Sequence, residues 1–426
     1  MTPGPGADSY ILDKAGIARY LSGLPGIARR LGGAPASWAI EEIGDGNVNY
    51  VFGVHGEVGS VCLKQAPPYV RVAGPAWPLG PGRIGFENAA LVEHHKHAPR
   101  FVPRPLHHDA DRKLMVVEYL EGCQVLRYAL TAGEVHRHLA GDLGEYLALT
   151  LFWTSDLAIP AARKRALTAV FEGNSEMTGI MESMIFTDIY VNHPRNTWTR
   201  PFLDDAVADI QDDDRVKLAV SRLKLRYLTC KQALLHGDLH TGSVMTSGDR
   251  TWIIDQEFAC YGPIGYDIGI LIAHLIISYF ACDGNPAPEA RRAAFQSQVL
   301  DVIAGIWQKF RATFLALWES GADGDAYPAV LFPGEGGRKV VAVERGKFVD
   351  RLLPEAIRFC AAEILRRVIG FASVTDFTGI PDEAVRAACE RRSLVLAKTL
   401  LVIDQRRLDI VTLTELAQRI REESTG

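Results

Sequence analysis

The stretch from His236 to Glu257 constrains this chain more than any other. It reads HGDLHTGSVMTSGDRTWIIDQE, so it begins with a turn-forming HGDLH and ends with Asp255 and Glu257, directly after the apolar run Trp252–Ile254. The layout predicts one carboxylate in a loop and, after a hairpin, two more at the end of a strand. Phosphoryl transfer from ATP uses such a set, because one Asp orients the attacking hydroxyl group and accepts its proton while other carboxylates hold the Mg²⁺ that neutralises the phosphates. We therefore predict Asp238 as the catalytic base and Asp255 and Glu257 as Mg²⁺ ligands.

Each half of this pattern also has an ordinary explanation. An Asp after His-Gly can simply form a turn, and an Asp at the end of a strand is common. Their joint occurrence on either side of a strand-sized apolar run favours the catalytic interpretation.

The N-terminal region predicts a helix followed by a small antiparallel sheet. Residues 11–22 have helical spacing with Asp13 as a possible cap, and short strands are expected at 38–43, 50–54 and 60–64. The turn between the first two strands contains the candidate phosphate-binding residues Gly44, Asp45, Gly46 and Asn47. Glycine lets backbone N–H groups approach phosphate oxygens. However, Asn49 stands where a third glycine would complete a GxGxxG loop, so a plain hairpin remains an equal alternative.

Lys64 ends the third predicted strand, in VCLK. Such a lysine usually extends to solvent, but beside a phosphate loop it would contact the ATP phosphates and be steadied by a carboxylate on a helix. Residues 83–97 have a helical pattern, in which Glu87 is the candidate partner and Glu93 the nearest competitor.

The apolar strand at 114–120 precedes Glu121 and Gly122. In a two-lobed kinase the chain crosses between lobes at such a point, and we assign adenine contacts to main-chain groups of Glu118 and Tyr119. The pattern afterwards is mostly helical, with helices predicted at 134–154, 158–172, 174–184, 203–230, 265–282, 288–319, 353–372, 382–404 and 411–422. These elements predict an α+β, two-lobed protein-kinase-like fold, with a small antiparallel-sheet lobe at 1–120 and a large, mostly helical lobe at 121–426.

Two stretches lack a regular pattern. Residues 66–79 contain four prolines and are predicted to form a long loop, which is either functional or a surface crossing pinned by Tyr69 and Trp77. Residues 321–337 are predicted to be a loop as well.

Several positions depart from eukaryotic protein kinases. Ser243 stands where those enzymes have an Asn that binds a second Mg²⁺, and Glu257 replaces the Gly of DFG. No activation-loop pattern follows Phe258–Pro263. These departures favour a small-molecule kinase with a permanently assembled site.

Supporting roles are predicted for residues around the catalytic loop. His236 and His240 flank it without a third metal-ligand candidate nearby in sequence, which favours hydrogen bonding over metal binding. Asp267 either caps the apolar helix that it opens or reaches back to the loop. Arg366 and Arg367 point about 100° apart on a helix; either one packs while the other faces solvent, or both border the cleft and bind substrate hydroxyls and the transferring phosphoryl group.

Composition excludes other classes of protein. The net charge of −5 argues against a nucleic-acid partner, and seven scattered cysteines without a CxxC pair are typical of a reducing, cytoplasmic setting. The run Ile268–Ala281 is too short to span a bilayer and is predicted to be a buried helix. The N-terminus lacks the pattern of a signal peptide. We expect no membrane association.

The chain resembles the 5-methylthioribose kinase family of methionine salvage. The matching stretches are EEIGDGNVNYVF, KQAPPYVRVAGPAWPL, IFTDIY, ALLHGDLHTGSVM, IDQEFACYGPIGYDIG and LRRVIGFASVTDF. The resemblance implies a kinase-like fold, a homodimer, ATP and Mg²⁺ as cofactors, and phosphoryl transfer to the 1-hydroxyl group of the sugar 5-methylthioribose. It further implies Asp238 as base, Asp255 and Glu257 as metal ligands, Lys64 as phosphate contact and Arg366 and Arg367 at the substrate. It also makes Trp77 an active-site residue.

The chain differs from that family at two places. Gly122, Cys123 and Gln124 stand where the family often has a Pro-Pro-His-type segment, and Gln256 stands where proline is usual. Two alternatives stay open: an aminoglycoside- or choline-type kinase, and an inactive nucleotide-binding scaffold.

Overall fold

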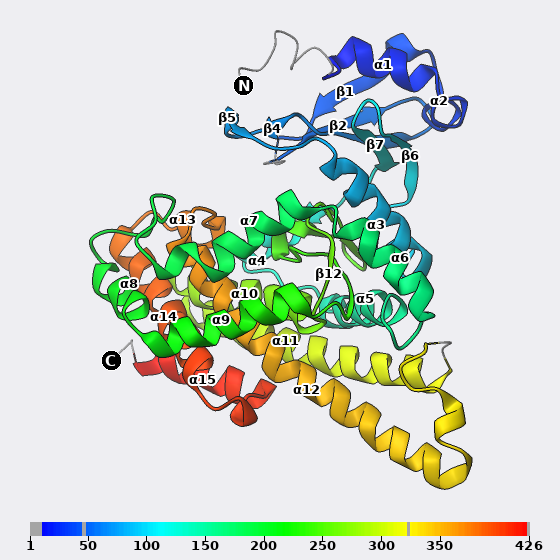
Figure 1. Cartoon of the computed structure of the whole chain (residues 1–426). Helices are drawn as coiled ribbons and strands as arrows, with labels where there is room; N and C mark the ends of the chain where they lie inside the picture. The colour runs from blue at the N-terminus through cyan, green and yellow to red at the C-terminus, as the bar shows by residue number, and fades with distance from the viewer. Residues whose placement is uncertain (1–10, 45–47, 322–323, 424–426) are drawn as a thin grey trace. The chain divides into compact units, whose positions relative to one another are not determined.

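The computed structural model describes residues 11–44, 48–321 and 324–423 (Figure 1). Its contacts group the chain into two compact units. The first comprises the described residues up to Cys123 together with Ile253–Phe258, and the second comprises Gln124–Trp252 and the described residues from Ala259 onward.

The first unit is built on a five-stranded antiparallel sheet with the strand order β1-β2-β3-β7-β6. Its strands are β1 Ala39–Glu42, β2 Tyr50–His55, β3 Ser60–Gln65, β6 Pro105–Asp109 and β7 Leu114–Glu118. The three strands predicted near the N-terminus are confirmed within one or two residues. The helix predicted at 83–97 is confirmed as α3, Arg83–His97.

Two N-terminal helices complete the core of this unit. The first, α1 Lys14–Ser22, is capped as predicted, because the Gly16 N–H donates to Asp13 Oδ1 at 2.7 Å. The second, α2 Pro25–Leu31, has no counterpart among the elements predicted above, because it lies in a stretch rich in glycine and proline. Proline is nevertheless well tolerated at the first helical position, and α2 buries Leu31 in the same core as Val61 of β3.

The prediction of a long loop at 66–79 is wrong. This stretch contains a two-stranded hairpin of β4 Tyr69–Val70 and β5 Gly74–Pro78, in which Gly74 adopts a φ of +65° at the turn. An isolated two-stranded ribbon tolerates prolines because an edge strand need not donate every N–H group. The buried guanidinium of Arg83 fixes the stretch by donating to the carbonyl oxygens of Pro67 at 2.9 Å and Gly80 at 3.0 Å.

The second unit is mostly helical. Its helices are α4 Leu126–Thr131, α5 Leu139–Trp153, α6 Ala161–Phe171, α7 Ser175–Phe186, α8 Asp204–Gln211, α9 Asp214–Thr229, α10 Gly265–Ala281, α11 Glu289–Glu319, α12 Gly334–Ile369, α13 Thr375–Thr378, α14 Glu383–Val402 and α15 Ile410–Glu423. Short strands flank the loop that contains Asp238: β9 Ala233–Leu235 pairs with β12 Cys260–Gly262, and β10 Val244–Thr246 lies between β8 Gln124–Val125 and β11 Thr251–Ile253.

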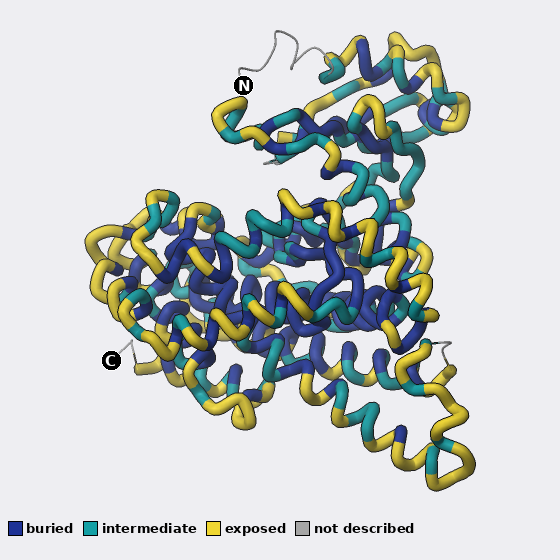
Figure 2. The backbone as a smooth tube through the Cα atoms, in the orientation of Figure 1, coloured by how far each residue is buried: buried dark blue, intermediate teal, exposed yellow. Residues whose placement is uncertain are grey.

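Helix α10 forms the centre of this unit. All of its residues are buried, and it packs against α12, α11 and α14 (Figures 1 and 2). A helix that is apolar on every side needs such surroundings. Among the described helices it alone has the length and hydropathy of a membrane span, but that span lies wholly inside the protein. The prediction of a buried helix here is confirmed.

Two helix predictions in this unit are wrong. The single helix expected at 203–230 is divided into α8 and α9, because Asp213 caps a new helix by accepting the Arg215 N–H at 2.9 Å. Helix α12 begins at Gly334, not at 353, and passes through Pro354. Its glycine-rich first turns have low helix propensity and are almost entirely exposed, whereas the rest of α12 packs mainly against α10. The loop expected at 321–337 is correspondingly shorter.

Candidate active site

The predicted catalytic loop, which contains Asp238, follows β9 directly and is held by α10. Asp267, in the first turn of α10, accepts the N–H of His236 at 2.7 Å and that of Gly237 at 3.1 Å. The cap position of this helix is occupied by Ile264. Of the two roles considered for Asp267, the geometry therefore supports the one that holds the loop. Burial raises the pKa of Asp267, against the opposing effect of His236 and the two N–H donors.

Three side chains shape the loop around Asp238. Ser243 Oγ donates to the Asp238 carbonyl oxygen at 3.1 Å, and the Asp238 N–H donates to His236 Nδ1 at 3.4 Å. His240 Nδ1 accepts the Gly242 N–H at 2.9 Å, which leaves its Nε2 atom 3.4 Å from Asp238 Oδ2. Burial and the charge of Arg127 lower the pKa of His240 well below its usual range. His240 is therefore neutral and turns an N–H group toward Asp238.

Arg366 and Arg367, in the last turn of α12, both point inward. Their side chains are buried, and the two Nη2 atoms each lie 3.2 Å from Asp238 Oδ1. The alternative with one solvent-facing arginine does not hold, because this end of α12 is enclosed by the protein. One carboxylate oxygen of Asp238 is thus held by two guanidinium groups, while the other faces His240.

Glu363, which the sequence reasoning missed, lies behind the two arginines. It is fully buried; its Oε1 accepts from Arg366 Nη2 at 2.8 Å and from Arg367 Nε at 2.6 Å, and its Oε2 accepts from Arg366 Nε at 2.8 Å. Burial alone would raise the pKa of Glu363, but the two guanidinium groups hold it well below its usual range. The spacing Glu-x-x-Arg-Arg places the three residues on neighbouring turns and is the signal that could have revealed it.

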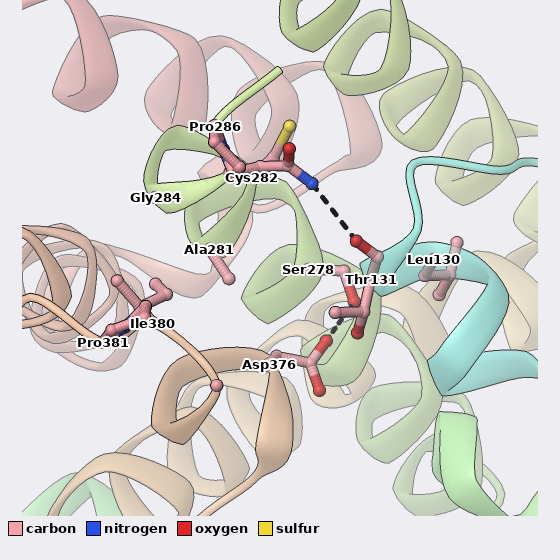
Figure 3. A pocket seen from close by; sticks show the side chains of 12 residues that line it. Leu130, Thr131, Ser278, Ala281, Cys282, Gly284, Pro286, Asp376, Ile380 and Pro381 are labelled. Carbon is pink, nitrogen blue, oxygen red and sulfur yellow. Dashed lines mark hydrogen bonds between the residues drawn. The ribbon is translucent and has the colours of Figure 1, made fainter.

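A buried polar chain continues from Glu363 to the far side of α10. His274 Nε2 lies 3.1 Å from Glu363 Oε1, and His274 Nδ1 lies 3.4 Å from Arg127 Nη2. Arg127 Nε lies 3.4 Å from Asp376 Oδ2, and Asp376 Oδ1 accepts the Ser278 hydroxyl at 2.6 Å. Asp376 and Ser278 line a cavity of about 340 Å³ together with Leu130 (Figure 3).

The first unit contains a separate cluster of three carboxylates. Oxygen atoms of Glu87, Asp255 and Glu257 all lie within 4.8 Å of one another. Lys64 Nζ donates to Glu87 Oε1 at 2.7 Å and also pairs with Asp255. Burial would lower the pKa of Lys64, but Asp255 and Glu87 outweigh it and raise that pKa. Glu93, the competing partner, instead pairs with Lys96 and His97 on its own helix.

Asp255 and Glu257 are fixed by local backbone geometry and by an asparagine. Asp255 has a φ of +71°, a left-handed conformation that costs energy in a non-glycine residue. Glu257 Oε2 accepts from Asn49 Nδ2 at 2.8 Å, and Asn49 Oδ1 in turn accepts from Arg83 Nε at 3.0 Å. The asparagine that interrupts the GxGxxG pattern therefore supports Glu257, which the sequence did not reveal.

The chemistry of this cluster fits a hard divalent cation. Its donors are carboxylate oxygens, which Mg²⁺ prefers, and Glu87 Oε2 is buried without a hydrogen-bond partner. Burial and Asp255 raise the pKa of Glu257 to about 8. A cation close to these carboxylates would relieve their mutual repulsion.

The remaining predicted residues of the first unit have varied surroundings. Gly44 is exposed, and its carbonyl oxygen accepts from Arg71 Nη1 at 3.3 Å. The Glu118 N–H donates to the Arg104 carbonyl oxygen at 2.9 Å, so this N–H group is already used. Tyr119 packs edge-on against the His55 ring. Trp77 is half-buried on β5. Asp45, Gly46 and Asn47 lie outside the described residues.

Comparisons with known proteins give consistent similarities. The model of the phosphotransferase enzyme family matches residues 39–306. A methylthioribose kinase of Escherichia coli is 40% identical, with 90% of this chain and 91% of that protein covered. Methylthioribose kinase 1 of Oryza sativa is 39% identical (92% and 91% covered), and a methylthioribose kinase of Yersinia pseudotuberculosis is 39% identical (85% and 86% covered).

Proposed function

This chain belongs to the phosphotransferase enzyme family, and we infer from its similarity to methylthioribose kinases that it is an ATP-dependent methylthioribose kinase. The observation that carries this inference is the identity of 40% over nine-tenths of both chains. Such coverage includes the catalytic loop and the paired arginines. Methylthioribose is therefore the sugar that accepts the phosphoryl group, and the reaction belongs to methionine salvage.

We assign acceptor activation to the second unit. Asp238 would orient the 1-hydroxyl group of methylthioribose and take its proton as the γ-phosphoryl group of ATP is transferred, giving the 1-phosphate and ADP. Arg366 and Arg367 would bind the sugar hydroxyls and the negative charge that spreads over the phosphoryl group. Their contacts with Asp238 Oδ1 support these roles.

We assign nucleotide and metal binding to the first unit. Lys64, steadied by Glu87, would contact the ATP phosphates, and Asp255 and Glu257 would hold Mg²⁺. When bound, Mg²⁺ supplies positive charge that neutralises the phosphate oxygens. The three-carboxylate cluster and its buried lysine support this assignment. The turn at 44–47 and the main chain at 118–119 are proposed nucleotide contacts, and Trp77 a proposed substrate contact.

We further propose a cytoplasmic homodimer. Every described cysteine is free, which suits a reducing compartment. Apolar side chains are exposed at the outer end of the α11–α12 pair, where Val330 and Leu331 are 82% and 67% exposed and Val340 is exposed as well. Exposed apolar side chains of this kind suit contact with a second copy. Sedimentation equilibrium of the wild-type chain and of Leu331→Asp tests this, since a dimer formed here would dissociate in the variant.

A coupled ADP-release assay tests the function. Mg-ATP is supplied with methylthioribose, ribose, choline or kanamycin, and the product is analysed by ³¹P NMR. We expect turnover on methylthioribose with a 1-phosphate product. Turnover only on another acceptor would support kinase activity but contradict methylthioribose as the substrate. No turnover on any acceptor, with ATP still bound, would contradict the assignment of this chain as an enzyme.

A further inference from the structure

We propose that Glu363 and His274 form a buried positioning pair that sets the orientation of both active-site arginines. The proposal rests on the function proposed above, because it concerns the residues that face the acceptor sugar. Among the described residues no hydrogen bond joins Glu363 or His274 to Asp238, so Glu363 would act through Arg366 and Arg367, and His274 through Glu363.

Glu363 binds part of each guanidinium group and leaves one nitrogen of each free to face Asp238. Arg366 gives Nε and Nη2 to Glu363, and its Nη1 lies 3.6 Å from Met181 Sδ. Arg367 gives Nε to Glu363 and Nη1 to the Ala372 carbonyl oxygen at 3.3 Å. In both cases Nη2 is the atom that faces Asp238. Glu363 therefore fixes one side of each guanidinium group and directs the Nη2 atom of each arginine toward Asp238.

Glu363 also balances the charge of the two arginines. Two adjacent buried guanidinium groups repel each other, and a buried charge needs a partner. Asp238 alone would have to balance both. Glu363 supplies a second negative charge between the arginines. Asp238 and Glu363 together therefore balance the two positive charges of Arg366 and Arg367. Without Glu363, both forks would be drawn more strongly onto Asp238, which would be less available to the acceptor hydroxyl.

His274 in turn fixes the orientation of Glu363. Glu363 can only accept hydrogen bonds, so His274 Nε2 at 3.1 Å must be the donor. His274 Nδ1 then accepts from Arg127 Nη2, which fits the neutral ring that burial and the charge of Arg367 enforce. The carboxylate of Glu363 thus receives donors from α10 as well as from its own helix, and it cannot rotate without losing one of them.

Substitutions at both positions separate positioning from general stability. Glu363→Gln removes the shared negative charge while keeping the shape of the side chain. We expect kcat/KM for methylthioribose to fall about 100-fold, the size expected when groups at a reacting centre are misplaced. KM for ATP should stay within about twofold, since the nucleotide contacts proposed above lie on other residues.

Conservative replacement of His274 provides the rescue test. Gln can place an amide N–H near the position of Nε2 and donate to Glu363, whereas Leu cannot. We expect His274→Gln to retain most of the activity and His274→Leu to lose about tenfold. The matched control is Glu355→Gln, because Glu355 also lies on α12 and pairs with an arginine, Arg226, at 2.8 Å, but makes no contact with the arginine pair. Glu355→Gln should keep wild-type kinetics.

The experiment measures kcat and both KM values for the wild-type chain and these four variants, together with their melting temperatures. The expected result for Glu363→Gln is a lower kcat/KM for methylthioribose with a nearly unchanged KM for ATP. For His274, the Gln variant should keep most of the activity that the Leu variant loses. Wild-type kinetics in Glu363→Gln, or equal losses in the Gln and Leu variants of His274, would overturn the proposal. If the wild-type chain turns over another acceptor instead, the proposed substrate fails and the same comparison with that acceptor still decides the positioning role.

Discussion

The backbone N–H of His236 lies 2.7 Å from the Oδ2 atom of Asp267, 31 residues further along the chain. The other oxygen of the same carboxylate accepts the next N–H, that of Gly237, whose φ is +88°. Two hydrogen bonds to one buried carboxylate therefore fix the turn that precedes Asp238, the proposed catalytic base. The Asp238 carboxylate is in turn held by Arg366 and Arg367 of α12, so this residue is positioned from two helices.

Replacing Asp267 with Asn should disturb this turn. Asn has one carbonyl oxygen, and its NH₂ group would face a backbone N–H that needs an acceptor. We expect a loss of about 1–3 kcal/mol in the free energy of unfolding, as for a buried donor left without a partner. Activity should fall with it, because the turn carries Asp238. Urea unfolding and ADP release measure the two effects; unchanged stability would contradict the assigned role of Asp267.

Replacing Asn49 with Asp should alter the requirement for Mg²⁺. The substitution keeps the shape but turns the donor that faces Glu257 into a negative charge. We expect the Mg²⁺ concentration at half-maximal activity to change by about 10- to 100-fold, a typical effect of losing a residue that orients a metal ligand. A Mg²⁺ titration of turnover measures it. Asn49→Ala removes the donor without adding charge and should therefore show a smaller change in the Mg²⁺ requirement. Equal changes in the two variants would contradict a contribution from the added negative charge.

The buried His274 predicts how stability depends on pH. Burial and Arg367 lower its pKa to about 3 in the folded chain, whereas the unfolded ring titrates near 6.5. Between these values the unfolded state binds a proton that the folded state does not, so stability falls as pH decreases from about 6.5 toward 3. The contribution of one such group is at most about 1.4 kcal/mol per pH unit. His274→Gln should lose less stability than the wild type between pH 7 and pH 5 in urea unfolding; parallel curves would contradict this.

The sequence could predict those elements and contacts that depend on residues close together in the chain. The helix at 83–97 and the cap at Asp13 follow from spacing and from one side chain beside its own helix. The candidate residues Lys64 and Glu87 followed from an analogy between short motifs, and the structure joins them at 2.7 Å. Their functional roles stay predictions.

Features that depend on distant packing could not be predicted. The Glu-x-x-Arg-Arg spacing could have placed Glu363 beside the two arginines, but its burial and its contact with His274 depend on α10. The support of Glu257 by Asn49 joins residues 208 positions apart. In both pairs the deciding partner lies far away in the sequence. The start of α12 at Gly334 was missed for another reason, because its glycine-rich first turns are almost entirely exposed and have low helix propensity.

The most direct test of the account is turnover by Asp238→Asn. This substitution keeps a side chain that can receive the arginine donors but removes the proton acceptor. We predict that kcat for methylthioribose falls by at least about 100-fold, within the range for loss of a general base. ATP binding, measured by calorimetry, should change little, because the proposed nucleotide contacts are elsewhere. Substantial turnover by Asp238→Asn would contradict the assignment of the base, and with it the proposed mechanism.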